Sequence, residues 1–224
     1  MSLALIQKLN AMLLAEMPEY RGQAAGVGET EEAQRNLLRA LMNVRPPLPL
    51  TEAFVRLQDE LLAAEREKHG VIDVTALSTA PSDERITLWQ GDITRLSADA
   101  IINAANAALL GCFIPCHRCI DNVIHSAAGL QLRAECAALM ERQGHPEETG
   151  AAKITQGYNL PARYVIHTVG PIVSGALTDE HRELLASCYR SCLHLAAEHG
   201  LRSIVFCCIS TGEFHFPNKE AAEI

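Results

Sequence analysis

Residues 98–108 read Ala-Asp-Ala-Ile-Ile-Asn-Ala-Ala-Asn-Ala-Ala, an apolar stretch with two asparagines towards its end. Short apolar runs rich in β-branched or aromatic residues also occur at residues 86–89, 164–169 and 203–208. We predict strands here, because such residues favour strands. Helical patterns lie between these runs at residues 122–141 and 179–198. This alternation predicts an α/β fold with a largely parallel sheet, in which ligands bind at the carboxyl ends of the strands.

The first 80 residues predict a helical extension to this domain. Leu3, Ile6, Leu9 and Leu13 have helical spacing, and a second apolar face runs from Leu37 to Met42. Arg45-Pro-Pro-Leu-Pro49 ends that helix, and Thr51 is a suitable N-cap for a third helix that reaches about His69. We therefore divide the chain into a helical extension, residues 1–80, and an α/β domain, residues 81–224.

Composition excludes several classes of partner. The net charge is −8 at pH 7, which argues against binding to a nucleic-acid backbone but not against an anionic small ligand held by backbone amides. We expect no signal peptide and no membrane partner, because residues 1–16 carry polar residues and no apolar run is long enough to span a bilayer. The eight cysteines are then expected to be reduced thiols in the cytoplasm.

One loop concentrates soft metal ligands: Gly111-Cys-Phe-Ile-Pro-Cys-His-Arg-Cys-Ile-Asp-Asn122. Thiolate sulfur and imidazole nitrogen are the ligands that zinc prefers. The alternative is a run of buried cysteines, but His117 and Arg118 make a poor apolar segment. We predict one zinc ion bound by Cys112, His117 and Cys119, with one position open. A closed site with Cys116 as fourth ligand is the alternative.

Five segments, in their order and spacing, resemble a macrodomain, the ADP-ribose-binding α/β fold, over most of residues 85–217. They are Gln90-Gly-Asp-Ile-Thr94, Ala100-Ile-Ile-Asn-Ala-Ala-Asn106, Ile124-His-Ser-Ala-Ala-Gly129, Ile166-His-Thr-Val-Gly-Pro171 and Ile209-Ser-Thr-Gly-Glu-Phe-His-Phe-Pro217. Ordinary members have a glycine-rich loop where this chain has its cysteines. The chain therefore resembles the zinc-dependent macrodomains of microbes, which also carry a helical extension.

The resemblance implies a zinc-dependent, glycosidase-type hydrolase that removes mono-ADP-ribose from modified proteins. Its family is associated with sirtuin-type transferases and lipoate-linked carrier proteins, which are therefore expected partners. Two alternatives remain at this point. One is a non-catalytic reader of ADP-ribose with a structural zinc, and the other is a deacetylase acting on O-acetyl-ADP-ribose.

The resemblance also implies roles for individual residues. Asp92 would accept a hydrogen bond from the adenine amino group, Ile93 would contact the base, and Asn106 would bind hydroxyls of the distal ribose. Asp92 could equally cap a turn, and Asn106 could be a satisfied turn asparagine. The phosphate-side loop at the start of the next helix would consist of Cys119, Ile120 and Asp121. We expect Asn106 and Asp121 to lie nearest the reaction, although Asp121 could be a plain N-cap.

The resemblance further implies a second diphosphate loop at Ser210, Thr211, Gly212, Glu213 and Phe214, where successive backbone N–H groups could cradle the phosphates. An ordinary strand-to-helix turn is the alternative for this segment. His125 and His167 are expected to be buried core histidines. In the family, a helix, a strand and a closing helix follow this loop. The last residue of this chain is Ile224, so we expect the closing strand and helix to be absent. Either the chain is a fragment, or a partner chain or a rearranged segment fills the gap in the sheet.

Overall fold

The apolar stretch at residues 98–108 forms β3 (Ala100–Ala105), one of the two inner strands of a four-stranded sheet in the computed structural model, which describes residues 3–224. β3 runs parallel to β5 (Tyr164–Val169) on one side and to β6 (Ile204–Val205) on the other. β4 (Ala152–Gln156) pairs antiparallel with β5, which gives the order β4-β5-β3-β6. The predicted mixed and largely parallel α/β sheet is confirmed.

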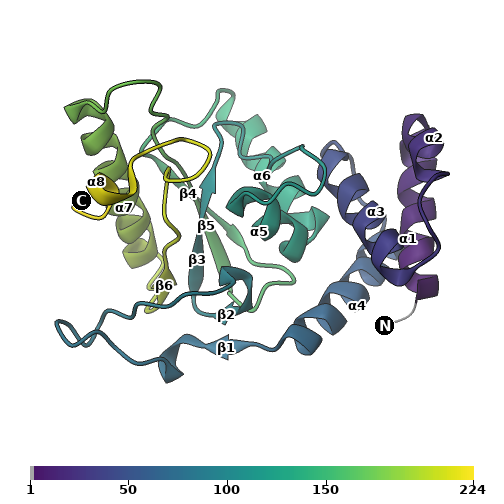
Figure 1. Cartoon of the computed structure of the whole chain (residues 1–224), viewed down its shortest axis with the longest axis horizontal. Coiled ribbons are helices and arrows are strands. Elements are labelled where there is room, and N and C mark those ends of the chain that lie inside the picture. The colour runs from purple at the N-terminus through teal and green to yellow at the C-terminus, as the bar shows by residue number, and fades with distance from the viewer. Residues whose placement is uncertain (1–2) are drawn as a thin grey trace.

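Helices cover both faces of this sheet (Figure 1). Alternate residues of a strand point to opposite faces, so Ile101 and Val165 pack with α5 (Ile120–Ala128) and α6 (Leu130–Gln143). Ile102 and Ile166 pack on the other side with α7 (Asp179–Glu198). The strand residues 164–169 and the helix 179–198 coincide with their predicted ranges.

The extension lies beyond α5 and α6, at the opposite end of the molecule from α7 (Figure 1). It contains α1 (Leu3–Glu16), α3 (Glu31–Val44) and α4 (Glu52–His69), which confirms the three predicted helices. Thr51 caps α4 as predicted, since its side chain accepts a hydrogen bond from the Phe54 N–H. Between α1 and α3 lie a short 3₁₀ turn (Pro18–Tyr20) and α2 (Arg21–Ala24).

The extension has its own apolar core, and one residue of the α/β domain belongs to it. Leu9, Leu38 and Leu61 are fully buried in this core, and Leu130 at the start of α6 packs into the same cluster. The Leu130 N–H donates to Gln58 Oε1 of α4 at 2.8 Å. The extension is therefore joined to the domain by apolar packing and by a buried hydrogen bond.

Three predicted elements differ from the structure. Residues 86–89 form no strand: no other strand among the described residues pairs with them, and Leu88 is 93% exposed. The predicted strand at 203–208 is reduced to β6, which pairs with β3 over two residues. The predicted helix 122–141 is two helices broken at Gly129, whose φ of 94° ends α5 and starts α6 in a new direction.

Smaller elements complete the chain. β1 (Ile72–Asp73) pairs in parallel with β2 (Leu96–Ser97), and the 3₁₀ turns Val74–Ala76 and Ile93–Arg95 flank this pair. α8 (Asn218–Ala221) is the last helix. β4 was not predicted, because Lys153, Thr155 and Gln156 leave this partly exposed edge strand with little apolar signal. Within residues 3–224, no helix is both long and apolar enough to cross a membrane.

Candidate functional site

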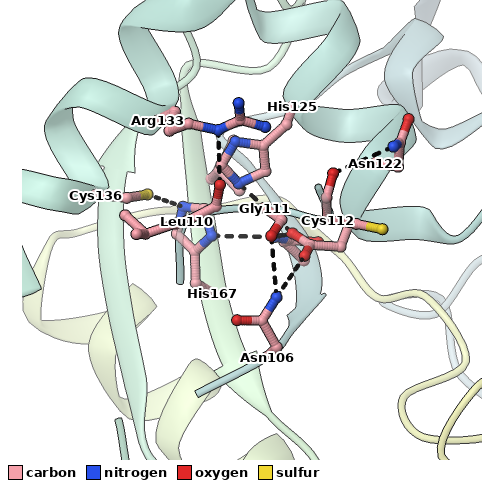
Figure 2. Close-up of polar contacts among 12 residues, drawn as sticks. Asn106, Leu110, Gly111, Cys112, Asn122, His125, Arg133, Cys136 and His167 are labelled. Atoms are coloured by element: carbon pink, nitrogen blue, oxygen red, sulfur yellow. Dashed lines mark hydrogen bonds and ion pairs between the residues drawn. The ribbon is translucent and has the colours of Figure 1, made fainter. Parts of the chain in front are cut away.

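The end of β3 and the start of α5 bring Asn106 and Asp121 together. Figure 2 shows Asn106 with the dashed hydrogen bonds of its side chain. Asn106 Nδ2 donates to Asp121 Oδ2 at 3.2 Å and to the Gly111 carbonyl at 3.1 Å. Its Oδ1 accepts from the Ala108 N–H at 3.0 Å. The Asn106 amide thus links the strand end, the following loop and the first turn of α5, as a satisfied turn asparagine that is still partly exposed.

Asp121 is almost fully buried, and burial raises the pKa of its carboxyl to about 6. Hydrogen bonds from Asn103 and Asn106 and the positive charge of Arg133 oppose this rise. Asn103 Nδ2 donates to Asp121 Oδ1 at 2.8 Å and lies 3.1 Å from His167 Nδ1. A carboxyl group with a pKa near 6 can serve as a general acid or a general base close to neutral pH.

His125 and His167 are buried, which confirms that both are core histidines. Their ring centroids lie 6.0 Å apart, and Figure 2 shows the two rings near each other. His125 Nε2 lies 3.5 Å from Asp121 Oδ1, and His167 Nε2 lies 2.9 Å from Thr155 Oγ1. Burial lowers the pKa of His167 to about 4 and that of His125 well below its ordinary value. Both rings are therefore neutral at pH 7. The Cys136 thiol packs against the same pair, 3.7 Å from His167 Nε2.

The metal loop, residues 112–119, folds back so that Cys112, His117 and Cys119 converge. Their ligand atoms all lie within 4.8 Å of one another, and Cys112 Sγ is 3.7 Å from His117 Nδ1. Cys119 also caps α5, since its sulfur accepts from the Asn122 N–H at 3.5 Å. Cys116 has a left-handed backbone with φ of 53°, and its sulfur contacts the Asn36 carbonyl of α3 at 3.4 Å. Three of the four candidate ligands are thus brought together, and Cys116 is turned away.

These three residues fit a zinc ion. Two ligands on a tetrahedral zinc are separated by about 3.6 Å for one sulfur and one nitrogen, close to the observed 3.7 Å between Cys112 and His117. Burial raises the pKa of the Cys119 thiol to about 11, and the neighbouring Cys112 sulfur adds to this effect. A bound cation would offset both effects, because thiols coordinate zinc as thiolates. Three protein ligands are also the number found in catalytic zinc sites.

The predicted diphosphate loop, residues 210–214, lies next to the metal loop. His117 Nε2 is 3.7 Å from Glu213 Oε1, which joins the two loops. Ser210 is buried with a φ of 63°, and its Oγ has no hydrogen-bond partner among the described residues. Gly170, at the end of β5, leaves space for this side chain: a Cβ there would lie 1.9 Å from Ser210 Oγ. The loop conformation therefore depends on a glycine 40 residues earlier.

Asp92 and Ile93 begin the short turn that precedes β2 and contacts α5. Asp92 Oδ1 accepts from the Thr94 N–H at 2.9 Å and from its hydroxyl at 2.7 Å, so Asp92 caps the turn at Ile93–Arg95. The Ile93 side chain is buried in the core. Asp92 lines a cavity of about 180 Å³ between the domain and α4, together with Arg66 of the extension. Of the described residues, none in the metal loop or the diphosphate loop lines this cavity.

Sequence reasoning missed several residues that shape the site. Asn103 carried a signal, as the one polar side chain in the middle of an apolar strand. Arg133 of α6 had none: its buried guanidinium donates to the Leu110 carbonyl at 2.7 Å, just before the metal loop. Arg39 and Asn43 of α3 also contact the metal loop, although they lie more than 70 residues before it in the chain. Such contacts are not encoded in any local pattern.

Comparisons with known proteins agree with this geometry. The family model described as Macro domain matches residues 102–224. A protein-ADP-ribose hydrolase of Treponema medium is 53% identical over 214 residues, covering 95% of this chain and 81% of the relative. A protein-ADP-ribose hydrolase of Staphylococcus aureus is 51% identical, covering 84% of this chain and 70% of the relative. A Trypanosoma brucei macrodomain crystallised with ADP-ribose is 34% identical, with a TM-score of 0.61, over 82% of this chain and 78% of that chain. The chain therefore belongs to the macrodomain family.

Proposed function

We propose that this protein is a zinc-dependent hydrolase that removes mono-ADP-ribose from modified protein side chains. The observation that carries the proposal is the buried Asp121 carboxyl, which accepts a hydrogen bond from the Asn106 amide and lies in the first turn of α5, next to its N-cap and proposed zinc ligand Cys119. The names of the Treponema and Staphylococcus relatives support the same reaction. The Trypanosoma macrodomain supports ADP-ribose as the group that is bound.

The reaction replaces one bond at the anomeric carbon of the distal ribose. Water oxygen bonds to this carbon, the bond to the acceptor side chain breaks, and the acceptor leaves with a proton while water loses one. Asn106 can orient the ribose hydroxyls, because its amide donates and accepts hydrogen bonds. Asp121 can accept a proton from a hydroxyl or a water, and its negative charge offsets the oxocarbenium-like charge that develops on the sugar.

Residues 210–214 are proposed to hold the diphosphate through backbone N–H groups, with Gly212 allowing close approach. Cys119, Ile120 and Asp121 begin α5, where the helix dipole favours an anion. Asp92 and Ile93 remain candidates for the adenine end. Asp92 Oδ1 already caps a turn, so Oδ2 is the atom proposed to accept a hydrogen bond from the base.

Cys112, His117 and Cys119 are the residues proposed to hold zinc. When bound, zinc would act as a Lewis acid that polarises a nearby hydroxyl or water and lowers the pKa of that group. A cation does not help to stabilise a positively charged sugar ring. We therefore assign the metal site to orienting the ribose and activating oxygen, and assign stabilisation of the sugar to Asp121.

The proposed substrates are mono-ADP-ribosylated proteins, with lipoate-linked carrier proteins as candidates and a sirtuin-type transferase as the proposed source of the modification. These two partners rest on the resemblance to zinc-dependent macrodomains. A cytoplasmic location is proposed because free thiols at the metal loop need a reducing compartment.

The test is release of ADP-ribose from a mono-ADP-ribosylated protein, measured before and after zinc is removed with a chelator. Release that stops with the chelator and returns with added zinc is the expected result. Binding of ADP-ribose without any release would instead identify a reader. Faster turnover of O-acetyl-ADP-ribose than of the protein conjugate would identify a deacetylase.

A further inference from the structure

One face of α3 in the extension contacts the metal loop at successive turns of the helix. Asn43 Oδ1 accepts from the Cys116 N–H at 2.9 Å. Arg39 Nη2 donates to the His117 carbonyl at 2.9 Å and to Asn122 Oδ1 at 3.0 Å. The Asn36 carbonyl lies 3.4 Å from the Cys116 sulfur. The spacing of 36, 39 and 43 places all three residues on the same side of the helix.

The three zinc ligands differ in how the α/β domain holds them. Cys119 is fixed as the N-cap of α5, and the Cys112 carbonyl accepts from Asn122 Nδ2 at 3.3 Å. His117 lies in the middle of the loop. Its ring lies 3.7 Å from Glu213 Oε1 of the domain, but its own N–H bonds only to the Ile114 carbonyl of the same loop. Among residues 3–224, Arg39 is the one donor from outside the loop to the His117 backbone.

The loop conformation also needs support at Cys116. A φ of 53° is unfavourable for a residue with a side chain, and such a conformation persists only where its surroundings hold it. Asn43 supplies that hold. Its side chain is buried, with Oδ1 on the Cys116 N–H and Nδ2 donating to Ser126 Oγ of α5 at 3.0 Å. The turn that directs His117 towards Cys112 and turns Cys116 away is therefore fixed by α3.

We propose that Arg39 and Asn43 are positioning residues that hold His117 in place and so set the affinity of the metal loop for zinc. This inference rests on the zinc site of the proposed function. Residues that orient a metal ligand without touching the metal typically change metal affinity by about 10- to 100-fold when they are replaced. The extension would thus be part of the metal site, in addition to packing on the domain.

The experiment measures zinc affinity of the full chain by competition with a chromogenic chelator, for the parent and for Arg39→Ala. The matched control is Arg35→Ala, one helical turn earlier, where the guanidinium pairs with Glu65 at 2.5 Å within the extension. We expect Arg39→Ala to weaken zinc binding by about 10- to 100-fold and Arg35→Ala to leave it unchanged.

A second pair of variants separates positioning from folding. Asn43→Asp keeps an oxygen acceptor for the Cys116 N–H, whereas Asn43→Leu removes it, so Asp should retain more zinc affinity than Leu. The absorption spectrum of the cobalt-substituted protein gives an independent readout, since the loss of a histidine ligand changes the ligand field. We expect the spectrum of Arg39→Ala to differ from that of the parent and that of Arg35→Ala to match it.

Each outcome has a distinct meaning. Parent-like zinc affinity in both Arg39→Ala and Asn43→Leu would overturn this inference and leave the proposed zinc site intact. Equal weakening by Arg35→Ala and Arg39→Ala would overturn it too, because the effect would then follow the stability of the extension as a whole. A parent protein that binds no zinc would overturn both the inference and the proposed site.

Discussion

The Asn106 amide donates a hydrogen bond of 3.2 Å to the Asp121 carboxylate and so connects the end of β3 to the first turn of α5. The other carboxylate oxygen accepts from Asn103, which also contacts His167. Both oxygens of Asp121 are therefore oriented by asparagines at β3 and its carboxyl end. Neutral amides hold this carboxyl in a fixed position beside the neutral ring of His125.

Replacing Asp121 with Asn should remove most of the hydrolysis and leave ADP-ribose binding in place. The amide has nearly the same shape, but it cannot accept a proton in the pH range of the reaction. General acid–base groups typically contribute about 10²- to 10⁴-fold, so kcat should fall by that amount. Turnover assays and calorimetric titration with ADP-ribose check the two parts. Asp179→Asn, at an exposed position of α7, is the control. Full activity in Asp121→Asn would exclude this role.

Cys116→Ser and Cys119→Ser should differ in zinc content. Only Cys119 points into the cluster, whereas the Cys116 sulfur contacts the Asn36 carbonyl. Serine at position 119 still caps α5, so loss of zinc there would not come from loss of the helix start. Zinc per chain after dialysis, measured by atomic emission, should be about one for the parent and Cys116→Ser and close to zero for Cys119→Ser. Loss of zinc in both variants would instead indicate the closed four-ligand site.

Gly170→Ala should weaken ADP-ribose binding through the diphosphate loop. The new Cβ would lie 1.9 Å from Ser210 Oγ, so Ser210 must move. Overpacking of this kind costs about 1 to 3 kcal/mol, which corresponds to roughly five- to 150-fold in affinity if the whole cost falls on the ligand-binding conformation of the loop.

The second change Ser210→Gly removes the clashing hydroxyl and suits the positive φ of that position, so the double variant should recover part of the affinity. Zinc affinity is the internal control and should not change in either variant. Parent-like ADP-ribose binding by Gly170→Ala would argue against a role for residues 210–214 in holding the ligand.

The free energy of unfolding should fall as the pH drops below about 6.5, partly because of His167. Its pKa is about 4 when folded, against an ordinary value of 6.5, so the unfolded chain takes up a proton that the folded protein excludes. Its contribution is complete above pH 6.5 and is lost progressively until the pH reaches about 4. Between pH 6.5 and 5 the loss amounts to about 2 kcal/mol.

Urea denaturation at pH 7 and pH 5 measures this loss. His167→Gln should show a smaller decrease in stability over this interval than the parent, and the exposed His194→Gln should behave like the parent. Because each variant is compared with the parent, contributions from the other titrating groups cancel. An identical pH dependence in the parent and His167→Gln would contradict the neutral buried state of this ring.

Much of the fold could be predicted from sequence because its signals are local. The helices at residues 52–69 and 179–198 follow from apolar spacing, and the start of the first follows from its N-cap Thr51. The central strands follow from continuous apolar runs, which are typical of strands buried on both faces. The strand expected at residues 86–89 has the right composition but no partner strand within residues 3–224, and an unpaired backbone does not form a ladder.

In the candidate site, too, some features follow from local sequence and others from contacts between distant segments. The sequence by itself determined which residue types are present: the soft ligands of residues 112–119, the asparagine at the end of β3 and the acid at the start of α5. Only the tertiary structure decided that His117 joins Cys112 and Cys119 while Cys116 turns away, and that α3 holds the loop from 78 residues earlier in the chain. The reason is that the direction of a side chain in an irregular loop depends on hydrogen bonds to distant segments. Those bonds exist only after the helices have packed.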